Sequence, residues 1–395
     1  MQKKRVSKKK LNTLDIPLVT IVGILVAFGI VMILSASAPS ALADYGNSYH
    51  YVIRQALAVV VGIVALIFFS KIDYHKYLKR RMYIFIYIVS VGILFLTQFN
   101  SIAISTNGAT RWISIGPLSL QPSEITKIGL IISAAGYFTD TKKWGDNTII
   151  DRNKFVLAWL VPTIALAIPA LVLYKMQNHL SAAAVIAIVY VVMMITAGIK
   201  AKHFFTIAGL SGILGVGYLF MKKDELLGGF RSNRIDAWLN IEEHEQGVGY
   251  QTLQSLYAIG SGGLFGVGLG KSTQKYLYIP EAHNDFIFSI IAEELGFIGA
   301  LFVIALFIAF AIRGLMIANN AKDKQGSLIA IGITTLITIQ AIINIAVVTN
   351  SMPNTGMALP FLSYGGTSVA ILLGAVGILL NVSRQGKKPE ENGEN

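Results

Sequence analysis

The feature that most constrains this chain is a series of ten apolar stretches, each 16 to 27 residues long. They are residues 16–35, 55–70, 82–99, 123–138, 155–174, 180–198, 204–221, 286–312, 327–348 and 363–382. A transmembrane helix needs about 20 apolar residues, and a helix satisfies its own backbone where lipid offers no partner. The second and fourth stretches are short, so we expect their helices to extend into flanking residues such as 51–54. The sequence therefore predicts an all-α polytopic membrane protein, a bundle of ten transmembrane helices.

Composition excludes the other broad classes of protein. Only 14% of the 395 residues are charged, whereas a soluble domain has about 25%. The chain has no cysteine, which excludes disulfides, thiolate metal sites and cysteine nucleophiles. The first apolar stretch follows six basic residues, as in a signal peptide, but it is longer than the usual 7–15 residues or so of such a signal. We therefore expect it to persist as a helix.

Lysine and arginine alternate from loop to loop and so predict the orientation. Of the 33 basic residues, 23 fall in one set of connections and tails, 8 in the other set and 2 inside the apolar stretches. Because basic residues favour the cytoplasmic side, both termini are expected there, with a large extracytoplasmic loop, 222–285, between helices 7 and 8. The chain then divides into a basic cytoplasmic tail (1–15), a membrane domain (16–383) and a second cytoplasmic tail (384–395). This topology and attraction to membrane lipids explain the net charge of +12, and no nucleic-acid partner is expected.

One motif in the large loop resembles a nucleotide phosphate loop. Residues 266–272 end in Gly270, Lys271 and Ser272, but Phe265 stands where the pattern needs its first glycine. The segment also lies on the outer side, away from ATP, so we interpret it as a tightly turned loop. The six histidines show no zinc-ligand spacing, and the chain has no Asp-x-Asp pair.

Ionisable residues in or beside the apolar stretches are costly in lipid and are therefore candidates for function. Glu124 and Lys127 are three residues apart at the outer end of the fourth stretch, close enough to pair on a helix. Such a pair either serves the reaction or acts as a strut between helices. Arg54, near the outer interface, either contacts a substrate or extends its charged end to the surface.

Three acids accompany the eighth stretch. Asp285 opens it, and this position suits either a catalytic carboxylate or a helix N-cap. Glu293 and Glu294 lie two turns further along, where we expect them to face other helices and hold the bundle together.

Four blocks of residues resemble, in order, signatures of the SEDS family (shape, elongation, division and sporulation). They are 107–112 with 121–127 (Asn-Gly-Ala-Thr-Arg-Trp and Gln-Pro-Ser-Glu-Ile-Thr-Lys), 249–251 with 254–255 and 258–266, 280–288 with 293–296, and 360–366 (Pro-Phe-Leu-Ser-Tyr-Gly-Gly). The blocks extend over nearly the whole chain. Glu281, Ala282 and His283 are similar to the division and sporulation (FtsW/SpoVE) branch, whereas RodA members tend to carry Arg after the Glu. Both the division and the sporulation roles fit these motifs.

The resemblance implies a peptidoglycan glycosyltransferase in the bacterial cytoplasmic membrane. Such an enzyme polymerises lipid II at the outer face, extends a growing glycan strand and releases undecaprenyl diphosphate. The family's essential acid maps onto Asp285 and its outer-end lysine onto Lys127. The implied partners are a class B penicillin-binding protein, which crosslinks the strands, and other division or sporulation proteins.

The reaction itself suggests roles for the candidate residues. An α-linked donor gives a β-linked product, so the transfer inverts, and the acceptor hydroxyl needs one base. Asp285 is the candidate base, with Lys127 keeping it charged or contacting the diphosphate. The remaining candidate substrate-binding residues are Arg111, Arg231, Arg234, Glu124, Glu281, His283 and Arg54, of which the first three suit phosphate oxygens. A divalent cation, Mg²⁺ or Mn²⁺, could help to hold the diphosphate, although no ligand cluster requires one.

The chain departs from the family pattern at two places, and neither receives a role. Gln177, Asn178 and His179 lack the proline common after the fifth stretch, and Ser119 replaces a frequent Arg.

Two other classes of function also fit the sequence. A lipid II flippase, or another transporter of a lipid-linked substrate, suits ten spans, but it needs polar groups at mid-membrane, and most candidates here lie at outer ends. Asn344 and the Glu293–Glu294 pair are the deeper exceptions. A non-catalytic scaffold would tolerate replacement of Asp285, which distinguishes it from an enzyme.

Overall fold

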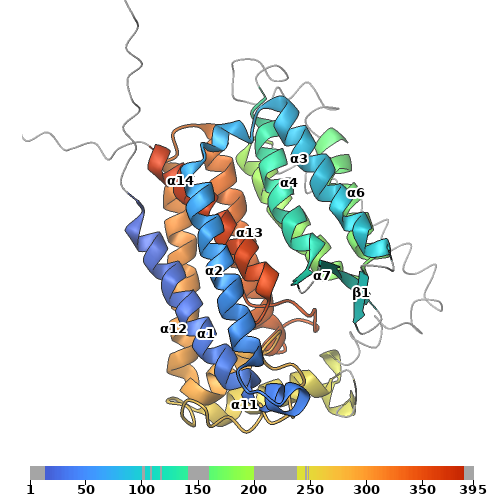
Figure 1. Ribbon diagram of the computed structural model, residues 1–395, viewed down its shortest axis with the longest axis vertical. Coiled ribbons are helices and arrows are strands. Elements are labelled where there is room, and N and C mark those ends of the chain that lie inside the picture. The colour runs from blue at the N-terminus through green and yellow to red at the C-terminus, as the bar shows by residue number, and fades with distance from the viewer. Residues whose placement is uncertain are drawn as a thin grey trace, which may run out of the picture.

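The computed structural model describes residues 14–99, 103–106, 109–115, 118–140, 160–199, 238–244, 247 and 249–386. Helices dominate these residues (Figure 1). They are α1 (Ile16–Tyr45), α2 (His50–Lys71), α3 (Arg80–Gly92), α4 (Pro122–Phe138), α6 (Val161–Lys175), α7 (Leu180–Thr196), α11 (Tyr250–Gly262), α12 (Ile287–Asn319), α13 (Lys324–Val348) and α14 (Gly366–Gln385). Short 3₁₀ turns add η1 (Tyr74–Lys76), η2 (Ile93–Gln98) and η4 (Ile241–His244).

The apolar stretches coincide with helices wherever the structure describes them. Among the described residues, six helices are long and apolar enough to cross a membrane, and α6 and α7 are shorter apolar helices. The second helix begins at His50, so it does extend as its short apolar stretch suggested. The predicted seventh span, 204–221, lies outside the described residues. The chain is thus a mostly helical multi-pass membrane protein.

A small antiparallel sheet, in the order β1-β2-β3, corrects the all-α prediction. Its strands are β1 (Ala103–Thr106), β2 (Ala109–Ile115) and β3 (Leu118–Leu120), in the segment between η2 and α4. Ile113 pairs with Ala103 on one side and with Leu120 on the other. Residues 109–115 are rich in β-branched and aromatic side chains, which favour a strand, but the segment is too short for a search for long apolar runs to detect.

The helices form two groups that meet at α13. In Figure 1, α1, α2, α12, α13 and α14 stand together, and α3, α4, α6 and α7 form the second group. α13 packs against α12 and α14 on one side and against α4 and α7 on the other. The turn before α12 and the connection between α13 and α14 meet beside α13 at Asn344, and this meeting creates the site described below.

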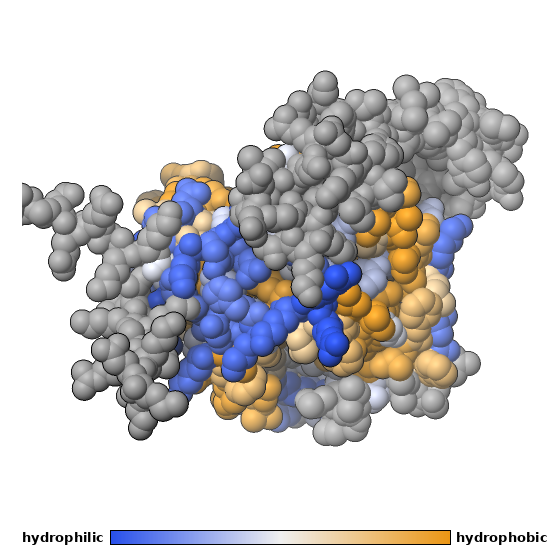
Figure 2. Space-filling view, turned by 90° about the horizontal axis from the view of Figure 1, so that it is seen from above, coloured by the Kyte–Doolittle hydropathy of each residue, from blue (hydrophilic) through white to orange (hydrophobic). Residues whose placement is uncertain are grey.

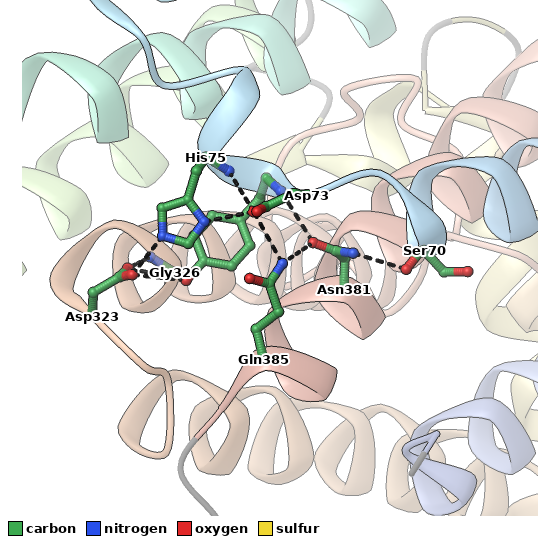
Figure 3. A network of polar contacts seen from close by, with 8 residues as sticks. Ser70, Asp73, His75, Asp323, Gly326, Asn381 and Gln385 are labelled. Atoms are coloured by element: carbon green, nitrogen blue, oxygen red, sulfur yellow. Dashed lines mark hydrogen bonds and ion pairs between the residues drawn. The ribbon is translucent and has the colours of Figure 1, made fainter. Parts of the chain in front are cut away.

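A polar network ties together the end of the molecule where α1 begins and α14 ends (Figure 3). The His75 ring lies between two carboxylates, 2.5 Å from Asp73 Oδ1 and 2.7 Å from Asp323 Oδ2. Burial acts to raise the pKa of Asp73, but hydrogen bonds from His75 and Gln385 outweigh it and lower the pKa to about 2. Asn381 Nδ2 donates to Ser70 O over 2.8 Å. The α2–α3 connection is thereby fixed to α13 and α14.

On its surface, the same end of the molecule has polar side chains at its centre. Figure 2, which looks onto this end, shows hydrophilic side chains in the middle and hydrophobic ones around them. Ser383 Oγ donates to Asp15 Oδ2 over 3.0 Å, so the start of α1 and the end of α14 lie together. A polar end face with an apolar rim is the pattern expected where a bundle emerges from a bilayer.

Candidate active site

Asp285 lies in the turn before α12 and is half-buried. The N-cap of α12 is the next residue, Phe286, whose side chain makes no capping hydrogen bond, so Asp285 stands one residue before the N-cap position. Its Oδ2 atom lies 3.3 Å from the place where a Cβ on Gly356 would stand. Gly356 has a φ of +64° and leaves that space open. The carboxylate therefore faces the connection between α13 and α14.

Asn344 of α13 holds the backbone at Asp285. This side chain is 1% exposed, and its Nδ2 donates to Asp285 O and to Met357 O, both over 2.7 Å. One amide thus joins the turn that carries the candidate base to the α13–α14 connection. Because buried carbonyls need partners, the turn is fixed relative to α13.

A second set of contacts reaches the same turn from α2. Tyr364 N donates to His283 O over 2.9 Å. Gln55, which is fully buried, donates through Nε2 to Ser363 O over 3.4 Å and accepts from Gly365 N over 3.2 Å. Gln55 was not predicted as a site residue, although a lone amide in an apolar stretch was a usable signal.

His283 sits in an aromatic cluster beside Asp285. Its ring centroid lies 4.2 Å from that of Tyr51 and 5.6 Å from that of Tyr364. Burial lowers the pKa of His283 to about 4, so the ring is neutral at physiological pH. Its Nδ1 has no hydrogen-bond partner among the described residues. A neutral imidazole at this place can donate or accept a hydrogen bond.

Two other predicted residues lie at the exposed edge of this cluster. Glu281 is exposed and accepts from Asn284 Nδ2 over 2.9 Å. Arg54 is exposed in the first turn of α2, within hydrogen-bonding reach of the Tyr364 side chain. Both charged groups can meet a ligand that approaches Asp285 from outside the bundle.

Glu124 and Lys127 form a buried ion pair in α4. Lys127 Nζ lies 2.6 Å from Glu124 Oε1, and the two residues are 4% and 7% exposed. Glu124 Oε2 has no hydrogen-bond partner among the described residues. Both residues belong to α4, so this hydrogen bond does not join two helices, as a strut would.

The connection between α6 and α7 adds polar groups next to this pair. Arg111 of β2 donates to Gln177 O over 3.3 Å and to Asn178 O over 2.7 Å. His179 is buried, and burial together with the charges of Arg111 and Lys127 lowers its pKa to about 3. His179 received no role from the sequence because its segment lacks the family's proline, and its proximity to Lys127, 52 positions earlier, arises only from the packing of α7 against α4.

The α13–α14 connection bridges these two groups of residues. Ser181 of α7, which follows His179 by two residues, donates through Oγ to Thr355 O over 3.1 Å. Thr355 precedes Gly356, which faces Asp285. The Asp285 turn and the Glu124–Lys127 region are therefore connected through one stretch of backbone.

A small cavity of about 10 Å³, room for about one water molecule, lies beside Lys127. Its other lining residues are apolar apart from the Tyr190 hydroxyl, and they come from α4, α7 and α13: Leu130, Ile131, Ile186, Val189, Tyr190, Met193 and Leu336.

Glu293 and Glu294 lie outside this site and hold the loop that precedes α12. Glu293 Oε1 accepts from Thr273 N over 2.9 Å, and its Oε2 accepts from Ser272 Oγ. In the loop that resembled a phosphate loop, Val267 N and Gly268 N donate to the backbone carbonyls of Glu293 and Glu294, and Ser272 N donates to Glu294 Oε1 over 3.3 Å. This arrangement agrees with the predicted holding role, with the loop and α1 as the partners.

Two predicted residues, Arg231 and Arg234, lie outside the described residues. In the described part of the chain, no three His, Asp or Glu side chains gather in a group that could hold a metal ion.

Comparison with known proteins decides the family. A family model described as a cell cycle protein, FtsW/RodA/SpoVE, matches residues 16–388. The chain belongs to the FtsW/RodA/SpoVE family. The match covers every described segment that forms the site.

Relatives within the FtsW/RodA/SpoVE family are similar over nearly their full length. Stage V sporulation protein E of Bacillus subtilis is 39% identical over 372 residues, 94% of this chain and 97% of that protein. A probable peptidoglycan glycosyltransferase FtsW of Trichlorobacter lovleyi is 40% identical over 374 residues, 95% of this chain and 94% of that protein. The FtsW and SpoVE names agree with the branch that the Glu-Ala-His sequence suggested.

Solved structures of the family share the fold. A chain from a peptidoglycan synthase complex that coordinates polymerization and crosslinking matches with a TM-score of 0.75 and 23% identity, covering 94% of this chain and 98% of that one. The rod shape determining protein RodA of Thermus thermophilus matches with a TM-score of 0.67 and 24% identity, covering 95% and 99%.

Proposed function

We propose that this chain is a peptidoglycan glycosyltransferase that polymerises lipid II for septum synthesis in division or sporulation. The relatives named FtsW are described as probable peptidoglycan glycosyltransferases, and SpoVE is named for sporulation. The observation that carries the proposal is the position of Asp285, a half-buried carboxylate on a turn that Asn344 fixes and that faces the α13–α14 connection.

The proposed topology places this turn at the outer face of the bacterial cytoplasmic membrane. It comprises ten spans, cytoplasmic termini and an extracytoplasmic loop over 222–285. Residues 16–383 then form the membrane domain, flanked by cytoplasmic tails 1–15 and 384–395. The shared end of α1 and α14 supports a common side for the two termini.

The proposed chemistry is a single inverting displacement. The acceptor sugar hydroxyl attacks the anomeric carbon of the donor, and the bond from that carbon to the undecaprenyl diphosphate oxygen breaks. Asp285 takes the hydroxyl proton as the new glycosidic bond forms. The diphosphate leaves with its negative charge, so cations can replace the acid that other inverting transfers use.

The proposed cationic partners surround the leaving group. Lys127 and Arg111 lie close to His179, whose neutral ring does not oppose their charge. Glu124 keeps the buried Lys127 ammonium paired until a phosphate arrives. Arg231 and Arg234 stay candidates from the sequence, as do Glu281, His283 and Arg54 for contacts to the sugars. A Mg²⁺ or Mn²⁺ ion at the diphosphate also stays a proposal.

The proposed partner is a class B penicillin-binding protein. A structurally similar chain comes from a peptidoglycan synthase complex that joins polymerization to crosslinking. A strand made here would need such a transpeptidase to become crosslinked.

The test is polymerisation of purified lipid II by the full chain in proteoliposomes, with and without a matched class B penicillin-binding protein. The variants are Asp285→Ala and Asp285→Asn, and the control is Glu242→Gln, an exposed acid in η4 of the same outer loop. We expect glycan strands from wild type and from the control, and none from either Asp285 variant.

Other outcomes would assign the chain differently. Wild-type rates in both Asp285 variants would remove this residue from catalysis. Translocation of a fluorescent lipid II headgroup without any strand, in folded protein and with the partner present, would establish a flippase instead.

A further inference from the structure

Two polar contacts join α1 to α12 near opposite ends of the apolar span. At one end, Arg313 donates through Nε to Asp15 Oδ1 over 2.9 Å and through a second nitrogen to Asp15 Oδ2 over 3.1 Å. At the other end, Ser35 Oγ lies 2.7 Å from both Glu294 oxygens. Lys275 Nζ donates to the same carboxylate over 2.9 Å.

The separation of these contacts matches the thickness of a bilayer core. Twenty residues lie from Asp15 to Ser35 along α1, and nineteen from Glu294 to Arg313 along α12. At about 1.5 Å per helical residue, the interval along α1 is about 30 Å, which is the hydrocarbon thickness, and the interval along α12 joins the same two contacts. Between the two levels α12 exposes large apolar side chains: Phe297, Ile298, Leu301, Phe302, Ile308 and Ile312. The two polar contacts therefore mark the inner and outer boundaries of the hydrocarbon core.

The loop 263–269 is attached at the outer boundary. α12 is interrupted at Gly296, which has a φ of +67°, and the loop backbone pairs with α12 on both sides of that break. Val267 N donates to Glu293 O over 3.0 Å, and Phe297 N donates to Gly263 O over 2.8 Å. These bonds place the loop within one turn of the Glu294 level, at the lower end of α12 in Figure 1.

The side chains of this loop are apolar and turned outward. Phe265 is 79% exposed and Leu264 is 64% exposed, and Val267 and Leu269 are exposed as well. The backbone is bonded to Phe297 and its neighbours, whose side chains begin the lipid-facing surface of α12. Apolar groups at this depth, continuous with that surface, gain free energy by leaving water for acyl chains.

We propose that the loop 263–269 is a membrane anchor whose apolar side chains insert into the outer leaflet of the bilayer. Its partner is the acyl-chain region of phospholipids. The anchor holds the first segment of α12, residues 287–295, at the membrane surface, and Asp285 stands directly before that segment. The inference depends on the depth and exposure of the loop and is independent of the catalytic proposal.

The absence of cysteine makes a direct depth measurement practicable, because a single introduced cysteine carries the only label. The full chain with Phe265→Cys, labelled with bimane, is placed in nanodiscs of phosphatidylethanolamine and phosphatidylglycerol. Leu301→Cys, on the exposed face of α12, is the lipid-facing control. Asp44→Cys, exposed in α1 nine residues beyond Ser35, is the aqueous control.

We expect lipids carrying a doxyl group near the headgroup to quench the label at 265 at least twofold more than the label at 44. Aqueous iodide should show the opposite order. Equal quenching of the labels at 265 and 44 would overturn the anchor. It would mean that the apolar side chains of this loop do not enter lipid and are available to a protein partner, which is missing from the nanodiscs. If Phe265→Cys does not fold, Leu264→Cys and Leu269→Cys test the same loop by the same criterion.

Discussion

Asn344 donates one amide nitrogen to the carbonyl oxygen of Asp285 over 2.7 Å, and the same nitrogen also donates to Met357 O. This residue of α13 therefore fixes the turn before α12 relative to the connection that faces it. The candidate base is positioned through its backbone, and its carboxylate stays half-buried beside Gly356.

Replacement of Asn344 by alanine should loosen this turn. Two carbonyls would lose a donor, at a cost of about 1–3 kcal/mol in the free energy of unfolding. Thermal melting in detergent and lipid II polymerisation should both decrease. Gln340→Met, a buried amide one turn earlier on the same helix, is the control and should leave polymerisation unchanged. Full activity in Asn344→Ala would show that the contact does not position Asp285.

The Glu124–Lys127 pair predicts a clear double-variant result. Glu124→Gln or Lys127→Met alone leaves a buried charge without its partner, which should destabilise the protein by about 3–5 kcal/mol. The double variant removes both charges and should recover most of the lost stability, measured by thermal melting. Polymerisation should stay low in the double variant, because the cation is gone. Recovery of activity together with stability would reduce the pair to a structural role.

His283 predicts a pH dependence of stability. Its pKa is about 4 in the folded protein against 6.5 for an ordinary histidine. Below pH 6.5 the unfolded chain binds a proton that the folded chain does not, so stability is greatest above pH 6.5 and falls as the pH approaches 4. At pH 5 the loss is about 2 kcal/mol. Melting temperatures at pH 7.5 and 5.0 should differ less for His283→Gln than for wild type, and an equal difference would exclude this origin.

The interruption of α12 predicts sensitivity to a single methyl group. A Cβ on Gly296 would lie 2.3 Å from Gly266 N, and the φ of +67° disfavours any other residue. Gly296→Ala should therefore lower the melting temperature and the yield of folded protein. Gly260→Ala, at a helical glycine of α11 with open space around it, should leave both unchanged. An unaffected Gly296→Ala would mean that the loop and α12 can separate without cost.

Much of the helical frame was predictable because lipid imposes a length and a composition on each span. The sheet was not, because its strands have three to seven residues and lie outside the apolar runs. The candidate site was predictable in part. Asp285 and Lys127 stood out as charges at span ends, and Asn344 was visible as a deep polar residue without an assigned partner.

The rest of the site depends on contacts between distant segments. His179 approaches Lys127 only because α7 packs against α4. Gln55 forms its hydrogen bonds with residues more than 300 positions later in the chain. Lys275 lies just after the segment 266–272, and nothing in the sequence pointed to its partner. Its pairing with Glu294 follows from the return of that loop onto α12.

The contacts of Asp15 with Arg313 and of Ser35 with Glu294 also determine how the protein meets bilayers of different thickness. Because α1 and α12 are tied at both levels, they cannot slide past each other to shorten or lengthen their common apolar span. A thinner membrane must therefore tilt the two helices as one unit or deform around them. Hydrophobic mismatch would then move the short segment of α12 before Gly296 and change the orientation of Asp285 relative to the membrane plane.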